Sequence, residues 1–171
     1  MTDAAAETTI LVLCRDRLEA LARPAAYRMT NSFLRQHDVY TRHLGMRPNK
    51  LLVYLVIVVA TVQRLMRGGL PPHWLGTTRM NRSIVGFISR RGIAGATGLP
   101  RENVRRIVDE LAGEDRLIFG PRGSIANKGG IMERPETMPI LVEMAQEIAA
   151  SAELLIRLGI LELTPSSSAE D

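Results

Sequence analysis

The chain has 171 residues and a formal net charge of +4, and its composition is 46% hydrophobic and 23% charged. Disorder throughout would require low hydrophobicity and a high net charge, so this composition predicts a folded protein that buries its own core. The single cysteine, Cys14, excludes an internal disulfide framework and a multi-cysteine metal site. We expect Cys14 to be buried as a small apolar residue rather than to act as a redox-active thiol.

Helical signals begin near the N-terminus. Apolar residues recur at helical spacing between residues 10 and 21, and Pro24 ends that helix or begins the next. We place the next helix from Ala25 to Leu44. The opening residues MTDAAAETT contain acids and no basic residue, which argues against a signal peptide and favours a cytoplasmic location.

Residues 51–62, LLVYLVIVVATV, form a continuous apolar run. The run is shorter than the roughly 20 residues that cross a bilayer, and charged residues flank it on both sides, so we expect no membrane segment. We predict a helix from about Asn49 to Arg67, buried in a core or a subunit interface, with a buried strand as the alternative. The stretch from Leu70 to Met80 should be a loop that Trp74 anchors to the core.

Charge is distributed unevenly along the chain. The count of Lys and Arg against Asp and Glu gives +5 for residues 1–78, +5 for residues 79–134 and −6 for residues 135–171. Within residues 79–106, seven Arg stand against one Glu. This local excess suits a polyanionic partner such as nucleic acid, although a solvated basic surface would give the same count.

Residues 81–134 contain capping and turn residues that predict two short helices. Ser89 can cap a helix over Arg90 to Thr97, and Gly98 can supply the tight turn that follows it. Pro100 suits the first turn of a second helix over residues 101–113. The apolar stripe of that second helix is expected to comprise Val104, Ile107, Val108 and Leu111.

A hairpin is predicted directly after the second helix. Residues 116–119 and 124–127 have the pattern of two short strands, and the intervening residues favour a turn. Arg122 lies at the tip of this hairpin.

Residues 88–118, ISRRGIAGATGLPRENVRRIVDELAGEDRLI, resemble the helix-turn-helix and wing entry of bacterial winged-helix regulators of the MarR and IclR types. The shared pattern is IA..TGLP..TV.R....L...G.I. The chain departs from it at Asn103, where Thr or Ser is usual, and at Asp115, where glycine is usual. The matching residues are Ile93, Ala94, Thr97, Gly98, Leu99, Pro100, Val104, Arg106, Leu111 and Ile118.

The resemblance implies a mainly α fold with a small β-hairpin wing, that is, a winged helix-turn-helix with flanking dimerisation helices. It implies a sequence-specific DNA-binding transcription regulator that acts as a homodimer on double-stranded DNA, with residues 101–113 in the major groove. The residues expected to contact base edges are Arg101, Asn103, Arg105 and Arg106. The residues expected to contact phosphates are Ser89, Arg90, Arg91 and Arg122.

Helical spacing of apolar residues returns after Pro135 and resembles the dimerisation arm of these regulators. The alternative is a helix that covers the core of its own subunit. We therefore divide the chain into N-terminal helices (1–80) that form core and dimer support, the DNA-binding region (81–134), a dimerisation helix (135–163) and a disordered tail (164–171). The apolar residues 51–62 are expected to support the same dimer.

An enzyme is not predicted, because the HExxH, GxSxG and GxxxxGK[ST] patterns are missing and the histidines His37, His43 and His73 are scattered. We expect no cofactor and no metal. The alternative function is a winged helix that serves as a protein-interaction module without specific DNA binding. Many regulators of the resembling types bind a small-molecule effector between the DNA-binding region and the dimer helices, so an effector stays a candidate partner.

Overall fold

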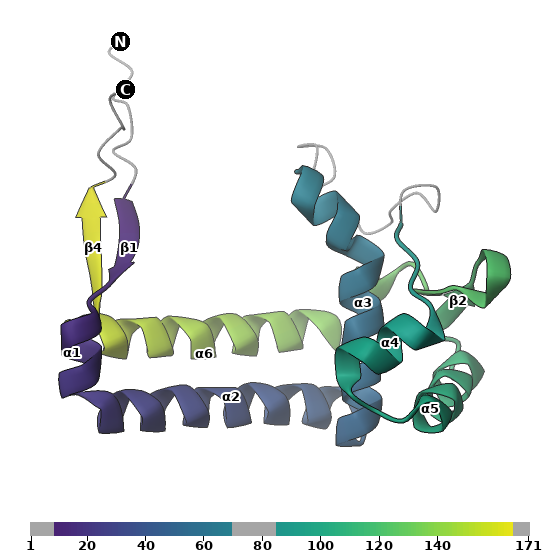
Figure 1. The fold of residues 1–171 in the computed structure, drawn as a ribbon, viewed down its shortest axis with the longest axis horizontal. Helices are drawn as coiled ribbons and strands as arrows, with labels where there is room; N and C mark the ends of the chain where they lie inside the picture. The colour runs from purple at the N-terminus through teal and green to yellow at the C-terminus, as the bar shows by residue number, and fades with distance from the viewer. Residues whose placement is uncertain (1–8, 70–84, 166–171) are drawn as a thin grey trace, which may run out of the picture. The chain divides into compact units, whose positions relative to one another are not determined.

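Helices make up most of the computed structural model, which describes residues 9–69 and 85–165 (Figure 1). The predicted mainly α class with a small antiparallel hairpin is confirmed. The chain divides into a first unit, residues 1–39 with 141–171, and a second unit, residues 40–140. This division differs from the predicted one, which placed a boundary near residue 80. The predicted loop over residues 70–80, with Trp74 and His73, lies outside the described residues.

A two-stranded antiparallel ribbon forms one part of the first unit. Strand β1 (Thr9–Leu13) pairs with β4 (Leu161–Pro165), and Leu11 lies opposite Leu163. The backbone groups of these residues are therefore satisfied by a partner about 150 positions away in the chain. The predicted disordered tail at 164–171 is wrong at its first two residues, which belong to β4, and its last six lie outside the described part of the chain.

Helix α1 (Arg15–Ala20) follows β1 directly. Cys14, half-buried at this junction, donates its backbone N–H to the Ile160 carbonyl at 2.9 Å and so continues the ribbon by one more bond. The predicted helix over residues 10–21 is therefore wrong before Arg15. Apolar β-branched residues fit a strand as well as a helix, and here a distant strand supplies the hydrogen bonds.

Two long helices, α2 (Ala22–Leu44) and α6 (Thr137–Arg157), complete the first unit. The last residues of α2 and the first residues of α6 belong to the second unit. They run antiparallel in Figure 1. Between them, the hydroxyl oxygens of Ser32 and Ser151 lie 2.9 Å apart, and Arg28 forms an ion pair with Glu147 at 2.9 Å. These polar contacts fix how the two helices align.

Helix α6 ends at Arg157, six residues before the predicted limit of the dimerisation helix. Gly159 adopts a φ of +67° and donates its N–H to the Ile156 carbonyl at 2.8 Å. A glycine in this left-handed conformation is a common way for a helix to end, and here it turns the chain into β4.

The second unit contains three further helices and a hairpin. These elements are α3 (Pro48–Gly68), α4 (Arg90–Thr97), α5 (Arg101–Gly113), β2 (Leu117–Phe119) and β3 (Ile125–Asn127), with short 3₁₀ turns at Pro121–Gly123 and Ile131–Glu133. The helices predicted at 90–97 and 101–113 are confirmed, and each hairpin strand begins one residue after its predicted start.

The core of the second unit lies where α3, α4 and α5 meet the hairpin. Strand β3 is held on its outer side by Ile88, which exchanges two backbone hydrogen bonds of 2.8 Å with Ile125. The Thr61 hydroxyl of α3 accepts the Asn127 N–H at 2.9 Å. Side chains that are completely buried here include Val53, Ile57, Ile93, Val104, Val108, Leu111 and Ile125.

Helix α3 is long and apolar enough to cross a membrane, a property that core helices of soluble proteins share. One side of it is buried in the core of the second unit, as predicted, whereas Leu52 and Val59 are exposed. Because the buried side faces its own protomer, those residues are not available for the subunit contact predicted for residues 51–62. The buried residues are Leu51, Val53, Tyr54, Ile57 and Thr61.

Candidate nucleic-acid interface

The turn between α4 and α5 is held by three residues that the sequence singled out. The Ser89 hydroxyl caps α4 by accepting the Gly92 N–H at 3.0 Å. Gly98 adopts a φ of +69° and donates its N–H to the Ala94 carbonyl. Pro100 then stands as the N-cap of α5 with a φ of −54°, one position before its predicted place in the first turn. The chain therefore reverses sharply between the two helices without leaving the Gly98 amide unsatisfied.

Helix α5 has one buried and one exposed side. The predicted apolar stripe is confirmed, since its four residues are between 0% and 4% exposed. Its other side carries Arg101, Glu102, Arg105, Arg106 and Asp109, all of them exposed. The stripe thus fixes the helix against the core and leaves a charged surface outside.

Arg105 is held in place by two carboxylates on this charged surface. It contacts Glu102 at 2.6 to 3.2 Å and Asp109 at 3.0 Å. The hydrogen bond from Arg105 lowers the pKa of Glu102, and the hydrogen bond to Glu102 raises the pKa of Arg105. Arg105 must exchange these ion pairs for a new acceptor before it can contact a ligand.

The predicted phosphate contacts lie around the start of α4 and the hairpin tip. Arg90 lies over the Phe119 ring, 5.7 Å from its centroid, and forms an ion pair with Asp109 at 3.5 Å. Arg91 is exposed, and so is Arg122, which occupies the tip of the hairpin with a φ of +55°. The Ser89 hydroxyl accepts as a cap and keeps its proton free to donate to a second acceptor.

Asp115, which departs from the family pattern, occupies a position suited to glycine. Its φ is +58°, its N–H donates to the Ala112 carbonyl at 3.0 Å, and its carboxylate pairs with Lys128. Aspartate tolerates the left-handed region better than most residues do. The turn after α5 therefore has the geometry that a glycine would give it.

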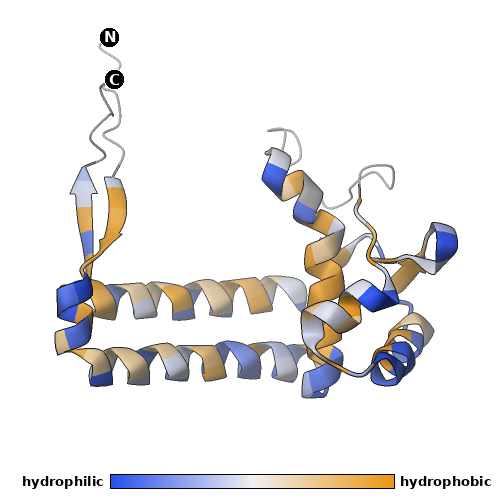
Figure 2. Cartoon of the chain, viewed as in Figure 1, coloured by the Kyte–Doolittle hydropathy of each residue, from blue (hydrophilic) through white to orange (hydrophobic). Residues whose placement is uncertain are grey.

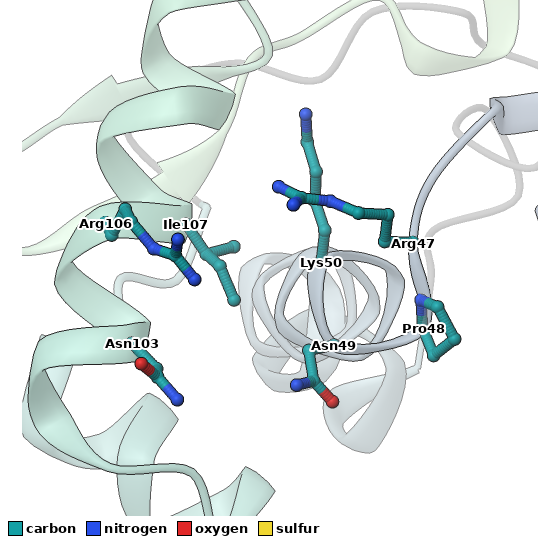
Figure 3. Close-up of a pocket in the computed structure, with 7 residues that line it drawn as sticks. All are labelled: Arg47, Pro48, Asn49, Lys50, Asn103, Arg106 and Ile107. Atoms are coloured by element: carbon teal, nitrogen blue, oxygen red, sulfur yellow. The ribbon is translucent and has the colours of Figure 1, made fainter.

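A pocket between the first turn of α3 and α5 was not found by sequence reasoning. Its volume is about 260 Å³. Figure 3 shows the Arg106 and Asn103 side chains extending from α5 toward α3, with the Arg47 guanidinium directed to the same space. The only local signal is the polar stretch RPNK at residues 47–50, because the approach of these residues to α5 depends on the tertiary fold. The lining residues are Arg47, Pro48, Asn49, Lys50, Asn103, Arg106 and Ile107.

The first unit exposes more large apolar residues than it buries. In its described part, three apolar residues are buried, namely Ala25, Val39 and Ile160, against thirteen large apolar residues that are exposed. Figure 2 shows β1 as hydrophobic along its length. The exposed set is Ile10, Leu11, Val12, Leu13, Tyr27, Met29, Phe33, Leu34, Leu141, Val142, Ile148, Ile156 and Leu163.

Among residues 9–69 and 85–165, no group of three or more His, Cys, Asp or Glu side chains is arranged to hold a metal ion. Comparison of the chain with protein-family models, with curated proteins and with solved structures finds no match. The resemblance to winged-helix regulators therefore rests on the pattern in residues 88–118.

Proposed function

We propose that this protein is a sequence-specific transcription regulator that binds double-stranded DNA through a winged helix-turn-helix in the second unit. The arrangement around α5 is the observation that carries the proposal. A buried apolar stripe anchors this helix, and arginines lie on its exposed side. A glycine turn precedes the helix, and a hairpin with Arg122 at its tip follows it. In a winged helix-turn-helix, the second helix enters the major groove and the hairpin contacts the flanking backbone.

The division of roles follows from the geometry of the exposed side chains. Arg101 and Arg105 extend from the outer side of α5, where a guanidinium can form two hydrogen bonds to a guanine edge. Ser89 and Arg91 lie at the start of α4 and Arg122 lies at the hairpin tip, and these exposed positions suit phosphate contacts, which supply affinity without specificity. Arg90, already held by Phe119 and Asp109, would contact a phosphate from a fixed position.

We also propose that the protein is a homodimer formed through the first unit. A two-stranded ribbon is marginally stable by itself, and both cross-strand partners Leu11 and Leu163 are more than half exposed. A stable interface covers about 800 Å² on each partner. A second copy that packs against the ribbon, α2 and α6 would cover part of this exposed apolar set and match the two-fold symmetry of most regulator sites. This assembly would act in the cytoplasm, with no membrane partner and no catalytic role.

A second candidate is a winged helix that binds another protein. The observation that favours it is the mixed charge of the exposed side of α5, where Glu102 and Asp109 lie beside Arg105. Carboxylates repel DNA phosphates but suit a protein partner with both signs of charge.

Anisotropy of a fluorescent random-sequence duplex separates the two candidates. A DNA-binding dimer that contacts about six phosphates should lose affinity with a log-log salt slope on the order of −5 between about 50 and 200 mM salt. A protein-interaction module should not show such a salt dependence of its affinity for DNA. No binding at low salt, or a flat response to salt, would contradict the proposed function.

A further inference from the structure

We infer that the pocket between α3 and α5 is a phosphate-class oxyanion site that takes one backbone phosphate of the bound DNA. This inference rests on the proposed function and deepens it. It supplies a backbone contact on the side of α5 that none of the residues Ser89, Arg90, Arg91 and Arg122 reaches.

The pocket offers several donors around a space large enough for a hydrated anion. Its volume of about 260 Å³ far exceeds the roughly 10 to 15 Å³ needed for one water molecule. Arg106 and Asn103 enter it from α5, and Asn49 lies across from them on α3 (Figure 3). Guanidinium and amide N–H groups converging from two helices suit the several oxygens of a phosphate.

The charges of the pocket are unevenly compensated. Arg47 donates to Glu110 at 3.0 and 3.2 Å, and Lys50 pairs with Glu114 and lies 3.8 Å from Glu110.

Arg106 is exposed, and among the residues that the structure describes it forms no ion pair within 4 Å. Its charge helps to lower the pKa of Glu102, which is lowered chiefly by the hydrogen bond from Arg105. Of the three cations that line the pocket, Arg106 is therefore the one without a contacting carboxylate in the described part of the chain, and an anion in the pocket would give it a direct partner.

The position of the pocket fits a helix lying in the major groove. A helix with its side chains is about 10 to 12 Å across and the groove is about 12 Å wide, so both sides of α5 would approach a phosphate backbone. On one side, Asp109 contacts Arg90 at the start of α4. On the other side lies the pocket with Arg106. We therefore assign Arg106 and Asn103 to the phosphate backbone, and leave base contacts to Arg101 and Arg105.

The test compares Arg106→Gln, Arg106→Lys and Arg157→Gln with the unmodified full-length protein on a random-sequence duplex across a salt series. Arg157 is the control, because it is an exposed arginine of the first unit that forms an ion pair with Glu153 at 2.7 Å. Arg106→Gln should lower the magnitude of the salt slope by about 0.9 for each bound protomer. Arg106→Lys should restore most of the slope, and Arg157→Gln should leave it unchanged.

A second arm distinguishes a DNA phosphate from a free one. Inorganic phosphate is titrated at constant ionic strength while the side-chain amide NMR signals of Asn49 and Asn103 are followed. If the pocket takes a phosphate of the DNA backbone, inorganic phosphate should cause only weak changes in these NMR signals, without saturation at millimolar concentration. Two results together would overturn the inference in favour of a free phosphorylated ligand. These are NMR shifts that saturate at low phosphate concentration, and a salt slope of DNA binding that is unchanged in Arg106→Gln.

The remaining outcomes separate the two proposals. If the unmodified protein binds random DNA with a steep slope and Arg106→Gln shows the same slope, the backbone site is wrong and the proposed function stands. If the unmodified protein does not bind DNA at low salt, both are wrong.

Discussion

Gly98 and Gly95 form a matched pair that tests the turn between α4 and α5. A Cβ built at either glycine meets no atom within 4 Å, so substitution by alanine introduces no clash at either position. Gly98 has a φ of +69°, whereas Gly95 has ordinary helical geometry inside α4. Gly95→Ala therefore shows the effect of the same substitution in ordinary helical geometry, whereas Gly98→Ala carries the cost of the left-handed backbone conformation.

The expected effects have opposite signs. Gly98→Ala should lower the free energy of unfolding by about 1 to 2 kcal/mol, the cost of a left-handed conformation for a residue with a Cβ. Gly95→Ala should raise it by up to about 1 kcal/mol, because alanine is the better helix former. For a unit of about 100 residues, each kcal/mol corresponds to a shift in Tm of about 4 to 8 °C.

Thermal unfolding followed by far-ultraviolet circular dichroism measures both variants, with the unmodified protein as reference. The backbone hydrogen bond from Gly98 to Ala94 survives either substitution, so neither variant should lose the fold. Equal shifts of the same sign in the two variants, or a Gly98→Ala variant as stable as the reference, would refute the turn geometry.

Four further substitutions test the proposed interfaces. Arg105→Ala should weaken binding to a specific site about tenfold to a hundredfold and relax the preference at one base position, whereas Arg122→Ala should weaken specific and random DNA about equally. Comparison of each variant on both DNAs checks this, and a uniform loss in both variants would argue against base contacts by α5. Phe33→Asp, at a side chain 66% exposed on α2, should convert the dimer to a monomer near 18.9 kDa in sedimentation while the circular dichroism spectrum is retained. A dimer that survives it would remove Phe33 from the interface. Glu102→Gln should release Arg105 and tighten DNA binding about two- to fivefold in anisotropy titrations, the range expected of an exposed ion pair, and weaker binding would contradict a restraining role.

The two helices and the hairpin over residues 90–127 were predictable because their signals are local. Ser89, Gly98 and Pro100 each have a backbone role that their own chemistry specifies, and the structure assigns them those roles or one adjacent to them. The apolar stripe of α5 follows from helical periodicity alone. Asp115 extends the same point, since it adopts a left-handed φ of the kind that glycine favours, and glycine is the residue usual there in the pattern that the sequence resembles.

The first unit was harder to predict because its contacts are distant in sequence. The pairing of Leu11 with Leu163 joins residues at opposite ends of the chain, and the spacing around residue 10 fits a helix equally well. The pocket was missed for the same reason, since Arg47 and Arg106 are brought together only by the packing of α3 against α5. Periodicity predicts which side of an element is buried but not which element covers it.

Selection of bound sequences from a random pool of duplex DNA tests the central claim most directly, because it reports specificity and symmetry together. A dimeric winged helix-turn-helix predicts enrichment of one inverted repeat whose half-sites are separated by about one helical turn or a multiple of it. The preference at one base position of the repeat should be lost in Arg105→Ala and retained in Arg157→Gln. A pool that shows no enriched sequence after repeated rounds, although the protein binds the duplex, would contradict a sequence-specific regulator.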